Sequence, residues 1–301
     1  MRKTTIKAIL LVFGVLFAFN SYAKKTVHLK MNLKKGASYE FVNKITSNIN
    51  QSIMGQDVKM IQDMDLIYTC NVEEVLANGN YSISYTINTL EMNMDVNGQK
   101  ISFNSNDNSD DNPIASIFKE LSGFKISFEL SPLGKVSNVD GIAAYLEKIN
   151  SNQLTKQSLG QFTDDKTFAQ YISQSYGFFP NKDVAVGESW SSSVTMPSLM
   201  NMDIVLNYKL NELNKNKAVI GINSEININS PIEKGGIKMD LLAKGTQKGS
   251  MHVNRKDGFI NDSSIEQLFD IKMTMDNPQN GEKLEIPMTV NTKVEVVVNR
   301  K

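Results

Sequence analysis

Apolar and polar residues alternate with a period of two along most of the chain. This is the pattern of β-strands that turn one face to a core and the other to water. In the first half the alternation predicts strands over 27–33, 39–50, 63–74, 81–87, 90–94, 124–130 and 135–139, and residues 52–60 are expected to cross a hairpin tip at Gly55. In the second half it predicts strands over 202–210, 218–226, 240–243, 249–253, 259–263, 267–275 and 285–298.

Glycine-containing dipeptides separate several of these segments. Asn78-Gly79, Asn97-Gly98 and Asn280-Gly281 are typical of two-residue hairpin turns, because both residues tolerate a positive φ. Strands joined by such short turns pair antiparallel, so the sheet is expected to be mainly antiparallel.

The periodicity changes between Gly141 and Tyr176. Apolar residues recur there at helical spacing, namely Ile142, Tyr145, Leu146 and Ile149, and then Phe168, Tyr171, Ile172 and Tyr176. We therefore predict two or three helices packed on a sheet. The expected fold class is β-rich α+β, with curved antiparallel sheets from two related strand blocks and a central helical segment packed against them.

The stretch Phe178–Trp190 carries the only Trp of the chain. Pro180 ends the helical region, because proline cannot continue a helix and holds Phe179 in an extended conformation. Gly187 then offers a turn before a strand that begins at Ser189. Trp190 is expected to anchor two layers of a core. The alternative is that it forms an aromatic wall of a ligand pocket.

The N-terminus has the layout of a secretory signal peptide. A basic start is followed by an apolar run from Ala8 to Phe19 and by small residues at Ser21 and Ala23. The run is shorter than the roughly 20 residues that a spanning helix needs, so a membrane anchor is disfavoured. We expect a signal peptide over 1–23, a first β block over 24–139, a helical segment over 140–178 and a second β block over 179–301. Residues 24–301 are expected to form one compact unit.

The two β blocks contain matching segments in the same order. The matches pair Gly36–Tyr39 with Gly187–Trp190, Met64–Ile67 with Met202–Val205, Asn71–Val75 with Lys209–Leu213, and Leu130–Val139 with Val253–Asp262. Each match alone is weak because strands resemble one another, but the shared order indicates an internal duplication. In a duplicated fold, each block could cover the apolar face of the other.

The chain also resembles a secreted bacterial family of unknown function, of the Bacteroidota type, identified as domain-of-unknown-function family 6263. The segments that carry the resemblance are Lys35–Tyr39, Gly79–Tyr81, Leu130–Val136 and Phe179–Trp190. The family pattern has a Pro after Lys182, where this chain has Asp183. The resemblance implies an exported, β-rich protein and supplies no catalytic residues.

Little in the sequence points to catalysis. The formal net charge is zero, which disfavours nucleic acid as a partner. Cys70 is the only cysteine, so no intramolecular disulfide can form, and His28 and His252 are the only histidines. The acidic loop over 104–112 lacks the central Gly and closing Glu of a calcium loop. No catalytic residue, metal or cofactor is expected.

Two functions agree with this composition. The first is an exported, non-enzymatic envelope protein that binds a lipid or other apolar ligand in a cavity between sheet and helix. The candidate lining residues are Met92, Met94, Trp190, Met273 and Met275, because methionines give a pliable lining. The second is a structural or protein-interaction module of the periplasm or cell surface without a small-molecule ligand. The expected partners are an apolar small molecule or another envelope protein. No transmembrane segment is expected after signal removal.

Export gives the first testable expectation. N-terminal sequencing of the protein recovered from the cell envelope should begin at or near Lys24. An intact Met1 start in a soluble cytoplasmic fraction would contradict export.

Overall fold

The computed structural model describes residues 25–106, 123–144, 147, 165–196, 202–234, 237–276 and 282–301. The expected signal peptide, residues 107–112 of the acidic loop and the Asn280-Gly281 turn therefore lie outside the described residues. Most of the segment between 145 and 164 lies outside them as well. Within the described ranges, no helix is both long enough and apolar enough to cross a membrane.

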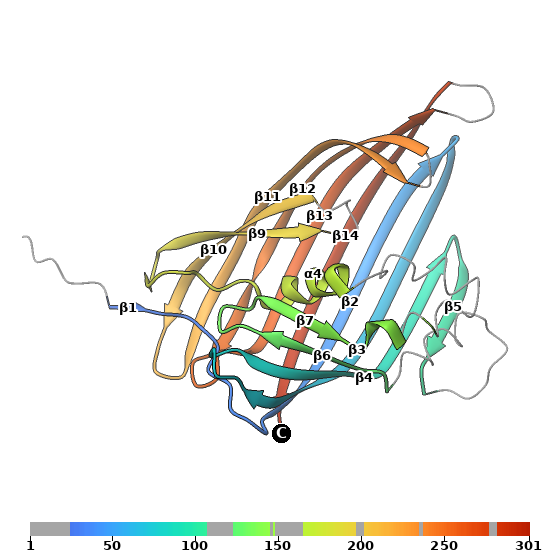
Figure 1. Cartoon of the computed structure of the whole chain (residues 1–301). Coiled ribbons are helices and arrows are strands. Elements are labelled where there is room, and N and C mark those ends of the chain that lie inside the picture. The colour runs from blue at the N-terminus through green and yellow to red at the C-terminus, as the bar shows by residue number, and fades with distance from the viewer. Residues whose placement is uncertain are drawn as a thin grey trace, which may run out of the picture.

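One antiparallel sheet of twelve strands forms the body of the protein (Figure 1). The strands lie in the order β7-β6-β4-β3-β2-β14-β13-β12-β11-β10-β9, and β5 pairs with β4. The first half of the chain contributes β2 (Ser38–Ile53), β3 (Gln56–Val75), β4 (Tyr81–Val96), β5 (Gln99–Asn104), β6 (Lys125–Leu130) and β7 (Val136–Asp140). The second half contributes β9 (Ser189–Met196), β10 (Met202–Leu213), β11 (Lys217–Lys234), β12 (Ile237–Asn254), β13 (Ile260–Asp276) and β14 (Lys283–Arg300). A separate two-stranded ladder joins β1 (Thr26–Val27) to β8 (Val184–Ala185).

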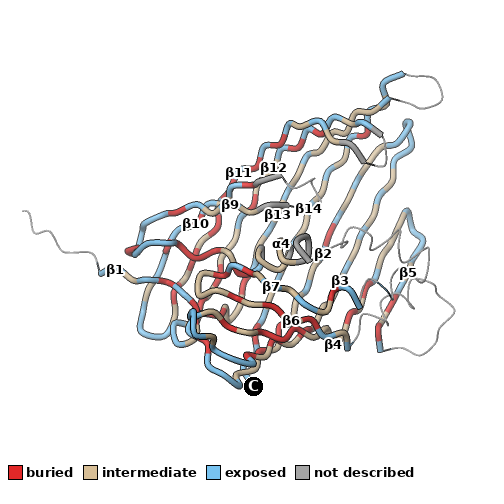
Figure 2. Tube along the Cα trace, viewed as in Figure 1, coloured by how far each residue is buried: buried red, intermediate tan, exposed pale blue. Residues whose placement is uncertain are grey.

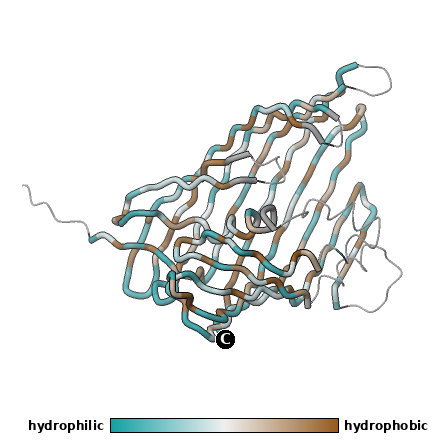
Figure 3. Tube along the Cα trace, in the orientation of Figure 1, coloured by the Kyte–Doolittle hydropathy of each residue, from teal (hydrophilic) through white to brown (hydrophobic). Residues whose placement is uncertain are grey.

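The long strands have one apolar and one polar face. In β2, for example, Phe41 and Ile45 lie on one face, while Glu40 and Lys44 lie on the other. Figure 3 shows this alternation of hydrophobic and hydrophilic residues along the long strands. The register keeps the apolar positions on a common face from β3 to β11. We call it the inner face, because the core residues lie on it and the shorter strands and α4 (Asp165–Tyr176) lie in front of it in Figure 1.

The hairpins predicted at glycine positions are confirmed where they are described, but at Asn78-Gly79, between β3 and β4, only Gly79 has a positive φ, 84°. Asn97-Gly98 joins β4 to β5, and both residues have positive φ, 52° and 89°. Gly55 is likewise the tip of the β2–β3 hairpin, with φ of 77°. Two successive positive φ values give a turn whose twist matches that of the paired strands. These turns set the register on which the common inner face depends.

A core fills the inner face at one end of the long strands, which we call the base. Figure 2 shows buried residues gathered at this lower end of the view. Leu29 and Met31 from the N-terminal segment, and Phe179 from the segment after α4, join the strand residues in this core. Phe41 stacks on Tyr68 within it, with ring centroids 4.7 Å apart. Burial of such large side chains is the main favourable contribution to folding at the base.

The helix α4 connects the two ends of the sheet. It contacts both β7 and β9, which are the first and last strands in the sheet order. The backbone N–H of Val136 in β7 donates to the hydroxyl of Ser173 in α4 at 3.2 Å. Just after the helix, the Gly177 carbonyl accepts a hydrogen bond from the hydroxyl of Ser192 in β9 at 2.9 Å. Because these bonds join opposite edges, they hold the sheet curved at the base.

The helical segment expected over 140–178 is not supported as a layer on the sheet. Within the described residues, α4 is the one helix of more than a single turn, and Ile142–Ala144 are also helical. The physical reason is that strand side chains and extended segments already fill the core at the base. One short helix is then enough to bridge the two edges.

Residues 27–33 also differ from the prediction of a strand. The apolar positions are buried, as the alternation implied, at Leu29, Met31 and Leu33. Only Thr26–Val27 pair with another strand, however. The rest of the segment crosses turns at the base, where the N–H of Met31 donates to the Pro132 carbonyl at 2.8 Å. A turn presents isolated backbone carbonyl groups and not the regular series that a neighbouring strand presents, so residues 28–33 form no β-ladder.

The strands β12 and β13 are longer than predicted. Residues 240–243 and 249–253 were expected to form two strands, but both belong to β12, and β13 likewise runs through 264–266. In β12 the inner face carries Gly245, Gln247 and Gly249 where the apolar pattern stops. These residues interrupt the hydrophobic alternation while their backbone continues the ladder.

The two β blocks share local geometry at positions that the sequence comparison aligned. In the first block, the N–H of Gly36 donates to the Val72 carbonyl at 2.8 Å. In the second, the N–H of Gly187 donates to the Leu210 carbonyl at 2.7 Å. In each block the strand residue returns a bond to the residue after the glycine, at 2.9 and 3.0 Å. Both glycines have positive φ, 80° and 90°. An internal duplication would produce matching geometry of this kind. The duplication itself stays a prediction.

The burial of Trp190 leads to a stability prediction. Its side chain is 8% exposed, its indole N–H donates to the Phe178 carbonyl at 2.9 Å, and its ring stacks on Tyr208. We expect Trp190→Ala to lower the free energy of unfolding by about 3–5 kcal/mol, because it leaves a large cavity. The measurement is urea denaturation, with Leu268→Ala, which is half-exposed on the outer face, as a control that costs about 0.5 kcal/mol or less. A red-shifted, readily quenched native emission, together with little loss of stability in the variant, would contradict the prediction.

Candidate ligand-binding face

Beyond the base, the inner face continues as an apolar surface on β3, β2, β14, β13, β12 and β11. We call this surface the trough. Its apolar residues are Val58, Met60, Ile49, Leu284, Ile286, Met288, Val290, Phe269, Ile271, Met273, Met275, Met239, Leu241, Ala243, Ile226, Ile228 and Ile232. They line up in rows across the strands, so that Ile49, Val290 and Phe269 lie side by side on β2, β14 and β13. Aligned rows of this kind make an extended apolar wall, interrupted by Gln51 on β2 and Ser230 on β11.

The described elements leave much of this wall open. The substantial contacts between described elements are those of neighbouring strands and those of α4 with β7 and β9. The trough residues of β13 and most of those of β14 remain partly exposed, and Figure 2 shows the same for the upper parts of the long strands. An extended, partly exposed apolar surface on a protein commonly marks a site for a ligand, a membrane or another protein.

Two of the candidate lining residues lie in the trough. Met273 and Met275 point to the inner face of β13, directly opposite Leu241 and Met239 of β12. Met273 also packs against a small core cluster that includes Leu241. Flexible thioether side chains at these places can adapt to ligands of differing shape.

The other three candidates lie on the inner face but elsewhere. Met92 and Met94 belong to β4, where Met92 is buried in a cluster with Leu90 and Phe103. Trp190 is on β9, in the core of the base. The sheet therefore gives all five residues a common face without bringing them together in one site.

A row of uncharged polar side chains crosses the inner face between the base and the trough. We call it the polar row. Its members lie directly opposite one another on six consecutive strands, β3, β2, β14, β13, β12 and β11, and are Gln62, Ser47, Thr292, Gln267, Gln247 and Ser224. Sequence reasoning missed this row, because its members are far apart in the chain and only the cross-strand register aligns them.

The members of the polar row bond to one another and to the backbone. The hydroxyls of Ser47 and Thr292 are 3.0 Å apart, and the amide nitrogen of Gln267 donates to the side-chain oxygen of Gln247 at 3.1 Å. The hydroxyl of Ser224 accepts a hydrogen bond from the backbone N–H of Asn207 at 2.8 Å. These contacts offset part of the cost of placing polar groups on an apolar face.

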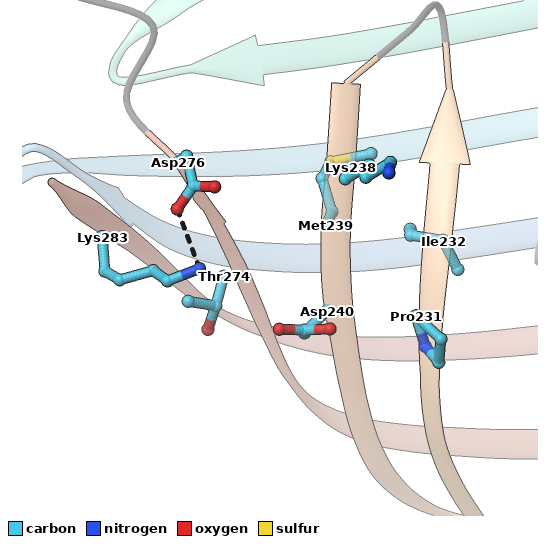
Figure 4. A pocket seen from close by; sticks show the side chains of 8 residues that line it. All are labelled: Pro231, Ile232, Lys238, Met239, Asp240, Thr274, Asp276 and Lys283. Atoms are coloured by element: carbon cyan, nitrogen blue, oxygen red, sulfur yellow. Dashed lines mark ion pairs between the residues drawn. The ribbon is translucent and has the colours of Figure 1, made fainter. Parts of the chain in front are cut away.

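An open pocket of about 530 Å³ lies where β11, β12, β13 and β14 end (Figure 4). Its lining residues are Pro231, Ile232, Lys238, Met239, Asp240, Thr274, Asp276 and Lys283. Figure 4 shows Lys283 directed at Asp276, and their ion pair measures 2.8 Å. Ile232 and Met239 belong to the trough, so the pocket adjoins its open end. Two lysines and two aspartates leave the pocket without a net charge that would select an ion.

Each histidine lies beside an aspartate at the surface. The Nδ1 atom of His28 is 3.0 Å from Asp183, and that of His252 is 2.8 Å from Asp262. All four side chains are more than a third exposed, so these are surface ion pairs that contribute little to stability. In the described part of the chain, no group of three or more His, Cys, Asp or Glu residues could hold a metal ion.

The lone thiol is part of the core at the base. Cys70 is buried, and its sulfur lies 3.4 Å from the hydroxyl of Tyr176 at the end of α4. Burial raises the pKa of Cys70 from 9.0 to about 12, although the Tyr176 hydrogen bond lowers it slightly. Burial also raises the pKa values of Tyr68 and Tyr176 well above their ordinary value. These groups remain neutral at physiological pH and have the character of core residues.

The sequence matches a family model described as "Family of unknown function (DUF6263)" over residues 78–260. This range extends from the β3–β4 turn to the start of β13. No curated protein matches the sequence.

Several solved structures resemble the sheet. One, described as "Lipid-protein interactions in lipovitellin", matches with a TM-score of 0.50 and 7% identity, over 89% of this chain and 25% of that chain. This chain therefore spans about a quarter of the length of that protein, and the likeness concerns the fold alone. Two others have lower TM-scores. An outer membrane channel from Pseudomonas putida F1 has 0.25 at 8% identity, covering 89% of this chain and 97% of that one. Pseudomonas aeruginosa OpdQ has 0.19 at 6% identity, covering 89% and 100%.

The raised pKa of Cys70 predicts its reactivity. Since only the thiolate reacts with an aromatic disulfide reagent, the native protein should show almost no reaction at pH 8. The same protein unfolded in guanidinium chloride should release one equivalent, because its thiol then returns to its ordinary pKa of 9.0. Rapid titration of one thiol in the native state would contradict the burial of Cys70.

Proposed function

The chain belongs to the family of unknown function DUF6263, as the resemblance predicted, and we propose that it is an exported, non-enzymatic envelope protein that binds a lipid or another apolar ligand. The binding surface in this proposal is the trough on the sheet itself, rather than a cavity between the sheet and a helical layer. Export rests on the signal-peptide pattern of residues 1–23.

The observation that carries the proposal is the unequal filling of the inner face. At the base, side chains such as Leu210 and Ile220 are fully buried by the chain's own core. In the trough, Met273, Met275 and Val290 keep the same apolar character but remain partly exposed. Apolar surface left in water is unfavourable by about 25 cal/mol per Å², so a ligand that covers the trough gains that free energy on binding.

The curvature of the sheet gives the trough the form of a binding site. The edges are joined at the base through α4, and the long strands extend beyond it (Figure 1). A molecule lying along the strands is then contacted from several strands at once. The fold resembles part of lipovitellin, whose structure is described in terms of lipid–protein interactions. That likeness is in accord with the proposal but adds no residue to it.

The alternative is a structural or interaction module in which another protein surface, rather than a lipid, covers the trough. The two functions differ in what the isolated protein binds. A ligand-binding trough takes up a small apolar probe in a saturable way, whereas a surface used only for protein contact has no such defined stoichiometry.

Titration with an environment-sensitive fluorescent fatty-acyl probe tests the proposed function. We expect saturable binding, and we expect Met273→Asp to weaken it at least about tenfold, since it puts a charge into an apolar surface. Leu242→Asp is the matched control: Leu242 pairs with Lys272, the residue next to Met273, but lies exposed on the outer face. It should change binding by about twofold or less.

The absence of saturable probe binding to the folded wild-type protein would contradict a ligand-binding function. Equal effects of the two substitutions would place the probe somewhere other than the trough.

A further inference from the structure

We propose that the ligand of the trough is amphipathic and uncharged, and that its hydroxyl, amide or ester group docks on the polar row while its hydrocarbon part lies in the trough. This inference rests on the proposed function and adds the chemical class of the ligand. It starts from the position of the polar row, where six polar residues on six strands share one level of the sheet.

The rows on either side of the polar row are apolar. Toward the open end, the next inner positions on β2, β14 and β13 are Ile49, Val290 and Phe269. Toward the base, they are Ile45, Val294 and Ile265. Other inner polar residues, such as Asn43, Gln51 and Ser230, have apolar partners on the neighbouring strands, so the polar row is the one level where polar residues continue across six strands of the described register. Strand formation does not require such a row, since β-branched residues on both sides serve that purpose. A polar group of a ligand at this level would give the row a partner.

The two glutamines of the row have bonding capacity to spare. A glutamine amide has two donors and one acceptor oxygen with two lone pairs. The bond from Gln267 to Gln247 uses one donor of Gln267 and one lone pair of Gln247. Within the described residues, the amide nitrogen of Gln247 and the oxygen of Gln267 make no other hydrogen bond. Turning both amides over reverses this bond and again leaves one amide nitrogen and one oxygen free.

The burial of Gln247 determines which class of ligand these free amide groups favour. Gln247 is only 8% exposed on the inner face. An apolar molecule lying over it would cut the amide off from water without replacing the lost hydrogen bonds, which is unfavourable. A ligand with a donor or acceptor at this level avoids that cost. The row therefore favours an amphipath over a pure hydrocarbon.

The ligand's polar group is uncharged, because the inner positions at and next to the polar row provide no counter-charge. Within the described register, the inner positions of the six strands are aliphatic, aromatic, Met, Gly, Ser, Thr, Asn, Gln or Cys, apart from Arg300 at the last position of β14 and Lys234 at the last position of β11. Lys234 is at the open end of its strand, ten residues beyond Ser224 of the polar row. Arg300 lies at the base and pairs with Asp257. A carboxylate or phosphate moved from water to the polar row would lose hydration without gaining an ion pair.

Competition against the fluorescent fatty-acyl probe tests this inference with three molecules of equal chain length: 1-monooleoylglycerol, oleate and octadecene. We expect the wild-type protein to bind monooleoylglycerol at least about tenfold more tightly than octadecene, equivalent to about 1.4 kcal/mol. Oleate at pH 9, where it is ionised, should bind more weakly than monooleoylglycerol.

The double variant Gln247→Met/Gln267→Met should lose the preference for monooleoylglycerol and keep, or improve, binding of octadecene. Methionine is close to glutamine in size and suits an apolar face, so this variant should fold. Thr292→Val, which removes a hydroxyl of the same row at almost constant volume, should reduce the preference in the same direction. Asn291→Met, on the exposed outer face next to Thr292, is the control and should leave the preference unchanged.

The outcomes separate the two proposals. If none of the three molecules displaces the probe, or the probe itself does not bind, the proposed function is wrong and this inference with it. If octadecene and monooleoylglycerol bind the wild-type protein equally, or the preference survives in both row variants, the trough binds apolar ligands but the polar row does not select them. If ionised oleate binds best, the ligand class is a charged amphipath and the inference is overturned.

Discussion

The structure depends on one constraint: a sheet with one apolar face must remove that face from water. At the base the chain does so with its own residues. The N-terminal segment, the segment after α4 and the strands themselves pack into one core around Phe259, Met31 and Leu210. Farther along the same strands, the alternation continues with equal regularity, but the described residues cover it much less. The proposed function follows from that difference between two parts of one face.

The closure at the base makes the rest of the arrangement possible. Twelve strands in one open sheet have two free edges, which are normally a liability. Here the edges β7 and β9 are both held by α4, through Ser173 and the Gly177 carbonyl. The indole N–H of Trp190 adds a further bond to the same turn at the Phe178 carbonyl. A curved sheet whose edges are joined at one end can leave its inner face uncovered at the other, where the trough lies.

The sequence was sufficient to predict the strand-rich antiparallel fold and the positions of the hairpins at Gly55, Asn78-Gly79 and Asn97-Gly98, because these features are local. It was also sufficient to align Gly36 with Gly187. Three features were not accessible. The joining of β7 to β9 is a long-range contact with no sequence signal. The alternation over 27–33 does not distinguish a strand from an extended segment lying across turns. The polar residue Gln247 interrupts the apolar alternation of β12, so the sequence pattern predicted two strands there. Gln247 also belongs to the polar row, from which the class of the ligand is inferred.

The most direct test of lipid binding is a native mass spectrum of the protein purified, without detergent, from the envelope of the cells that make it. We expect folded charge states that carry one or more adducts of lipid mass, released on denaturation and identified as neutral amphipaths. A spectrum of the folded protein at the bare polypeptide mass, unchanged after incubation with envelope lipids, would contradict lipid binding.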